Sequence, residues 1–80
     1  MNITTESTRV FTDYFKDANN WGGTPLIGGN VGGSKEERGN LTQLKKAKLI
    51  TTFRSNGDDW IDFTDTGIAY GKELGLRWYN

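Results

Sequence analysis

The chain has 80 residues, and its 10 Lys plus Arg balance its 10 Asp plus Glu, so the formal net charge is +0. This length predicts one domain over residues 1–80 with a small core, and a hydrophobic content of 34% favours a folded chain over a disordered one. The absence of cysteine and histidine removes disulfides, thiolate metal sites, the commonest zinc ligand and the usual general base.

Apolar residues at helical spacing predict the first helix over residues 5–18. We interpret this apolar stripe as core packing, with Glu6 near the N-terminal end, where the helix dipole favours a carboxylate. Asn19-Asn20 ends the helix, and Trp21 is expected to fold back onto the core. The stripe consists of Val10, Phe11, Tyr14, Phe15 and Ala18.

A glycine-rich stretch follows over residues 22–33. Thr24-Pro25 matches an N-cap followed by proline at the first helical position, which predicts a short, weak helix. Its apolar face would be Leu26, Ile27 and Val31. A phosphate-binding loop is the alternative, but the Walker pattern needs Gly-Lys followed by Ser or Thr, and here Ser34 precedes the lysine. We therefore do not expect nucleotide binding.

The next helix is predicted over residues 35–48, opened by a capping box of Ser34 and Glu37. Leu41, Leu44 and Ala47 are expected to point inward. The opposite face, with residues three and four apart, is either a solvated charged surface or a surface for DNA. It holds Lys35, Arg38, Gly39, Thr42, Gln43 and Lys46.

Asn56-Gly57 predicts a β-hairpin with a two-residue type I′ turn, because both residues readily adopt positive φ. The turn fixes the register, in which Arg54 faces Asp59, Phe53 faces Trp60, Thr52 faces Ile61 and Ile50 faces Phe63. The face expected to pack on the helices holds Ile50, Thr52, Ile61 and Phe63. The other face holds Thr51, Phe53, Trp60 and Asp62.

Thr64-Asp65-Thr66-Gly67 predicts the start of a last helix, and Gly75 is the expected C′ residue that closes it. The tail over residues 76–79 is apolar for its place in the chain. It either returns to the core or forms a dimer contact, because exposed aromatic patches mark interaction sites.

These elements resemble the winged helix-turn-helix family of DNA-binding proteins. The resemblance covers residues 5–76, and its most specific part is the segment over residues 40–50, then the hairpin, then Phe63-Thr64-Asp65-Thr66-Gly67. Lys48 stands where glycine is common in the family, and Arg38 stands where the pattern has an apolar residue if Gly32 is its turn glycine. The resemblance implies an α+β winged helix: a three-helix core, a hairpin wing on its C-terminal side and a closing helix.

The resemblance also implies a function: a small, phage-encoded transcriptional regulator that binds double-stranded DNA. The helix over residues 35–48 would enter the major groove and the wing over residues 50–63 would flank it. Lys35, Arg38 and Lys46 would hold phosphates and Gly39 would permit close approach, while Thr42 and Gln43 are candidates for base edges. Arg54 and Asn56 at the wing tip would touch the backbone or the minor groove. A homodimer on repeated half-sites, through Trp78, Tyr79 and the N-terminal helix, is the expected assembly.

Two other function classes follow from the charges. Asp58, Asp59 and Asp62 crowd the wing, which favours a winged-helix protein-interaction module or phage-encoded inhibitor without DNA binding. The same aspartates are the candidates for catalysis, but hairpin turns are routinely acidic, so we expect no enzyme, no metal and no cofactor. No apolar run approaches the roughly 20 residues that cross a bilayer, and no signal-peptide pattern is present. We expect no membrane partner and a cytoplasmic protein of a bacterium or phage-infected host cell.

Overall fold

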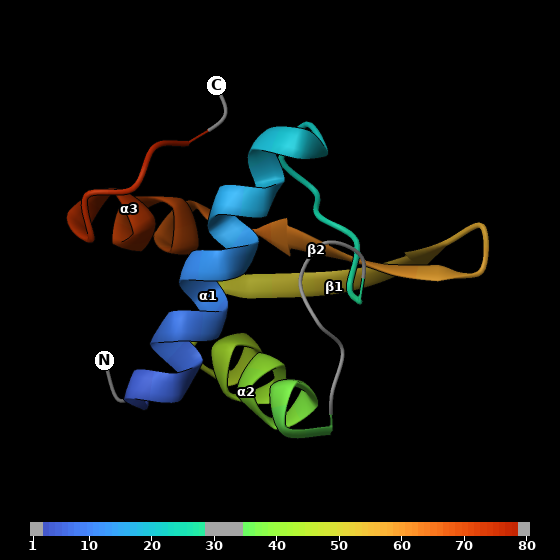
Figure 1. The fold of residues 1–80 in the computed structure, drawn as a ribbon, viewed down its shortest axis with the longest axis horizontal. Helices are drawn as coiled ribbons and strands as arrows, with labels where there is room; N and C mark the ends of the chain where they lie inside the picture. The colour runs from blue at the N-terminus through green and yellow to red at the C-terminus, as the bar shows by residue number, and fades with distance from the viewer. Residues whose placement is uncertain (1–2, 29–34, 79–80) are drawn as a thin grey trace.

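The computed structural model describes residues 3–28 and 35–78, with the backbone alone for residues 35–37. It has an α+β architecture in which helices pack on one face of a two-stranded antiparallel hairpin, compatible with a winged-helix layout. The hairpin tip extends beyond the helices (Figure 1). None of the helices in these residues is long and apolar enough to cross a membrane. The elements are α1 (Thr5–Asp17), the 3₁₀ turn η1 (Ala18–Asn20), α2 (Lys35–Lys46), β1 (Ile50–Ser55), β2 (Asp58–Phe63) and α3 (Asp65–Glu73).

Helix α1 forms the centre of the core and confirms the predicted apolar stripe, all of which is buried. The Thr4 side chain caps the helix by accepting a hydrogen bond from the Ser7 amide at 3.0 Å. Phe11 and Phe15 then pack edge-on against Phe63 of the hairpin, with ring centroids 5.5 and 5.3 Å away. Contacts of this geometry add to the hydrophobic stabilisation of a small core.

Helix α2 ends at Lys46, two residues before the predicted end. The reason is Lys48, whose φ of 63° lies in the left-handed region and cannot continue the helix. The Lys48 amide donates to the Lys45 carbonyl at 3.0 Å and the Leu49 amide to the Leu44 carbonyl at 3.1 Å, which is the Schellman closure. Lysine thus occupies the position where glycine is usual. The predicted capping box of Ser34 and Glu37 lies outside the described residues.

The hairpin confirms the predicted register over every pair from Ile50–Phe63 to Ser55–Asp58. Asn56 and Gly57 have φ of 54° and 81°, as a type I′ turn requires. The inner face is buried only near the base of the hairpin, at Ile50, Ile61 and Phe63. Thr52 on the same face is exposed, so the prediction that it packs on the helices is wrong.

The predicted helix at Thr24-Pro25 is wrong, because the chain pairs here with the open edge of β2 through a bridge at Leu26. The Ile61 amide donates to the Pro25 carbonyl at 3.0 Å, and the Ile27 amide donates to the Asp59 carbonyl at 2.9 Å. Leu26 forms an antiparallel bridge with Trp60. Strand pairing satisfies backbone groups that a short helix with interior glycines would hold poorly. The remainder of that predicted helix, including Val31, lies outside the described residues.

The prediction that Trp21 packs on the core is wrong. Trp21 remains 36% exposed and its ring meets that of Trp60 edge-on, with centroids 5.5 Å apart. The apolar tail, in contrast, does reach the core. Trp78 packs against Phe15 and Phe63 with centroids 5.1 and 5.5 Å away, so this part of the tail returns to the core. Tyr79 lies outside the described residues.

Helix α3 begins after Thr64 and is closed by Gly75, as predicted. The Thr64 side chain accepts from the Gly67 amide at 2.9 Å, and Gly75, with a φ of 80°, follows the helix as its C′ residue. The helix lies very close to the rest of the fold at two glycines. A Cβ on Gly67 would overlap the Leu49 carbonyl, and one on Gly71 would overlap the Phe15 ring.

We predict that Gly67→Ala lowers the free energy of unfolding by about 1–3 kcal/mol, the usual cost of overpacking, because the Leu49 backbone cannot move aside freely. Gly39→Ala is the matched control. This glycine also lies within a helix but has open space around its Cα, so alanine should stabilise the protein by up to about 1 kcal/mol. Urea unfolding measures both; equal effects of the two substitutions would contradict the close packing of α3.

A second prediction concerns the end of α2. Lys48→Gly should raise the free energy of unfolding by about 0.5–1 kcal/mol, because glycine removes the left-handed strain while losing some unfolded-state entropy. Lys48→Ala removes the same charge and keeps the strain. Thermal unfolding should therefore rank glycine above both lysine and alanine, and no gain for glycine over alanine would contradict the strain.

Candidate nucleic-acid interface

The outward face of α2 is the most cationic surface of a helix in the described chain. Its exposed residues recur three and four apart, opposite the buried Leu41 and Leu44. Helical spacing puts Arg38 and Lys45 on one flank, Thr42 beside them, and Lys46 and Gly39 together beyond Thr42. We call this surface the α2 ridge; it consists of Arg38, Gly39, Thr42, Lys45 and Lys46.

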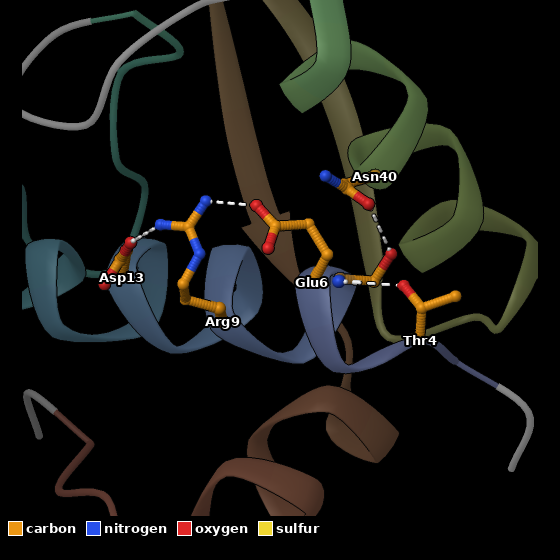
Figure 2. A network of polar contacts seen from close by, with 6 residues as sticks. Thr4, Glu6, Arg9, Asp13 and Asn40 are labelled. Atoms are coloured by element: carbon orange, nitrogen blue, oxygen red, sulfur yellow. Dashed lines mark hydrogen bonds and ion pairs between the residues drawn. The ribbon is translucent and has the colours of Figure 1, made fainter.

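The inner edge of α2 is fastened to the start of α1 by two polar contacts. The Ser7 hydroxyl donates to Asn40 Oδ1 at 2.9 Å (Figure 2). The Thr4 amide donates to Gln43 Oε1 at 2.8 Å. Ser7 is fully buried, so its contact with Asn40 lies inside the helix–helix interface. These bonds hold α2 so that the ridge faces away from α1.

The contact with Thr4 corrects the prediction for Gln43. We placed this residue on the outer face of α2, but it is half-buried and its carbonyl oxygen is engaged with α1. A side chain in this position does not share a surface with Arg38 and Thr42.

The ion pairs between described side chains lie away from the ridge. Arg9 bridges Glu6 and, at 3.3 Å, Asp13 along the outer side of α1 (Figure 2). The Arg9 guanidinium, through its hydrogen bond, holds the pKa of the Glu6 carboxyl below its usual value. The other pair joins Arg54 to Asp59 in the hairpin at 3.8 Å. The three ridge cations are thus not paired with a described carboxylate.

The ridge is low at Thr42 and Gly39, where the side chains are small or absent. A Cβ on Gly39 would meet no atom within 4 Å, so its backbone is open to the outside. Thr42 is exposed, and its hydroxyl donates back to the Arg38 carbonyl at 3.0 Å. That bond fixes the side chain and leaves its oxygen lone pairs and methyl group for an outside contact. A large ligand can therefore approach the helix backbone at Gly39, beside Lys46.

A groove of about 590 Å³ separates the ridge from the hairpin. Arg38 and Lys45 line it from α2, and Thr52 and Asp59 line it from the inner hairpin face. The carboxylate of Asp59 makes the hairpin side less attractive to an anion than the helix side. Its ion pair with Arg54, in which both side chains are more than half exposed, offsets this only in part.

The structure brings together half of the predicted site. Arg38, Gly39, Thr42 and Lys46 share the ridge, while Arg54 and Asn56 lie near the hairpin tip and are exposed. The side chain of Lys35 lies outside the described residues. Sequence reasoning missed Lys45, although its place seven residues after Arg38 and three after Thr42 puts it on the same face.

Among residues 3–28 and 35–78, no three acidic side chains gather in a way that could hold a metal ion. No protein-family model matches the chain, and no curated protein or solved structure matches it either. The geometry of the ridge and the hairpin is therefore what supports a function.

Proposed function

We propose that the protein binds double-stranded DNA as a small regulator, with the α2 ridge in the major groove and the hairpin beside it. The observation that carries the proposal is a helix whose exposed face has three cations, none paired with a described carboxylate, and the open backbone of Gly39 beside Lys46. An α-helix fits the major groove, and cations along the exposed face of such a helix reach the phosphates that border the groove.

The ridge residues divide into two roles. Arg38, Lys45 and Lys46 are assigned to phosphates, which supply affinity and set the position of the helix. Thr42 is assigned to a base edge, where its methyl group suits the methyl of thymine and its oxygen accepts from an amino group. Gly39 lets the helix backbone come close enough for this contact.

The wing has a smaller part in this proposal than the helix. Arg54 is 72% exposed and can reach the DNA backbone, as can Asn56 at the tip. Asp58 and Asp59 beside them repel phosphates, which opposes deep insertion. We do not propose a homodimer through Trp78, because this ring packs against Phe15 of its own chain.

We predict salt-sensitive binding to a 20-base-pair duplex, with each of Arg38→Ala, Lys45→Ala and Lys46→Ala reducing the slope of log K against log salt by about 1. Lys72→Ala is the control, because this lysine is exposed on α3, outside the ridge. Fluorescence anisotropy of labelled DNA over a range of salt measures the slopes. No binding at low salt by the folded protein, or an equal loss for the control, would refute the proposal.

A further prediction separates a fitted interface from general charge attraction. Gly39→Leu should leave stability intact, because the position is open and leucine favours helices. The added side chain should nevertheless lower DNA affinity at least about tenfold by holding the helix backbone away from the bases. The same substitution at Ala69, exposed on α3, should leave affinity unchanged. Unaltered binding by Gly39→Leu would leave only a charged surface and remove the groove-docking geometry.

A further inference from the structure

The outer face of the hairpin carries aromatic side chains that the core does not use. Phe53 and Trp60 are paired across β1 and β2 and alternate with the buried Ile61 and Phe63. Phe53 is 43% exposed, the largest exposure among the described large hydrophobic residues. Trp21 reaches the same face from the other edge of β2 and is also exposed.

Two of these rings, Trp21 and Trp60, are held in place before any partner binds. Trp60 meets the Trp21 ring edge-on at an interplanar angle of 73°. The Trp60 indole N–H donates to the Ser55 carbonyl at 3.2 Å, so its polar end is already satisfied. A fixed aromatic surface loses little conformational entropy on binding, which is the property of residues that dominate protein interfaces.

The charged side chains on the outer face of the hairpin strands are all negative. Alternation along β2 puts Asp58 and Asp62 on either side of Trp60, and both are exposed. The facing outward positions of β1 are Thr51, Phe53 and Ser55, which bring no cation. Arg54, the cation of the hairpin, belongs to the inner face, where it pairs with Asp59.

We propose that this outer hairpin face, made of Trp21, Phe53, Asp58, Trp60 and Asp62, binds a basic, extended segment of another protein. Lysine and arginine are attracted to the faces of aromatic rings as well as to carboxylates, so both components of the surface select the same side chains. Asp58 and Asp62 are four residues apart on one strand, or roughly 13 Å. An extended segment with cations at positions i and i+4 spans both carboxylates and covers Trp60 between them.

This surface is separate from the proposed DNA interface. Helix α2 and its groove lie on the side of the inner hairpin residues Thr52 and Asp59, whereas the aromatic rings alternate to the other side. A phosphate backbone is repelled by Asp58 and Asp62, so DNA does not compete for this face. The chain therefore has one surface for each kind of partner, and either proposal can fail without the other.

The first experiment uses a synthetic eight-residue peptide of alternating arginine and threonine, with an alternating glutamate and threonine peptide as its control. Two-dimensional NMR of the full chain follows the indole N–H signals of the three tryptophans. The basic peptide should shift the signals of Trp21 and Trp60 in a saturable way and leave that of Trp78 unchanged. Equal shifts with both peptides, or no shift at millimolar peptide, would overturn the proposal.

Variants then test the named residues. Asp58→Asn, Asp62→Asn and Phe53→Ser should each weaken peptide binding by about two- to fivefold, the range for exposed ion pairs and cation–π contacts. Glu73→Gln removes an exposed carboxylate on α3 and should have no effect. All four should bind duplex DNA with unchanged or slightly higher affinity. Equal peptide affinity of the wild type and the aspartate variants would refute the assignment.

A second copy of the chain is the other conceivable donor of a basic surface, through its α2 ridge. Signals of Trp21 and Trp60 that shift with protein concentration alone, and stop shifting in Lys45→Ala, would replace the proposed partner with self-association. Signals that are independent of protein concentration and respond to the basic peptide would support a different protein as the partner.

Discussion

The relative position of α2, the hairpin and α3 depends on one threonine. The Thr64 hydroxyl lies 2.6 Å from the Lys48 carbonyl and 3.1 Å from that of Leu49, and it also caps α3 by accepting from Gly67. The Thr64 amide donates to the Leu49 carbonyl at 3.1 Å. One residue thus ties the end of α2 to the base of both strands and to the first turn of α3. The close approach of α3 to the Leu49 backbone requires glycine at position 67.

Local signals in the sequence were sufficient for much of the fold. Asn56-Gly57 fixes the hairpin register, because a two-residue turn leaves no freedom in strand pairing. The apolar stripe of α1 and the two ends of α3 are likewise local patterns. For the candidate site, helical spacing alone puts Arg38 and Thr42 on the same surface, and applied one turn further it also includes Lys45.

Long-range contacts account for what the sequence did not reveal. The hydrogen bonds of Pro25 and Ile27 are made with the free edge of β2, whose residues are more than 30 positions further along the chain. Gln43 turns inward because its acceptor oxygen meets the amide of Thr4 across the helix interface. The Trp21 ring likewise packs against a residue distant in the sequence, Trp60, rather than on the core. A periodic pattern within one element cannot reveal these contacts, because each of them joins residues that are far apart in the chain.

The segment around Leu26 also affects how readily the hairpin can pair with a strand of another molecule. A bare hairpin has two open edges, each a template for another strand. Here the edge at β2 is covered by a segment that pairs with it only through a bridge at Leu26, and so short a segment is a poor template for a further strand. Among the described segments the open edge belongs to β1, where Arg54 adds a charge that discourages pairing. Within the described residues, the longer of the two exposed edges is therefore the one that carries a charge against pairing with another strand.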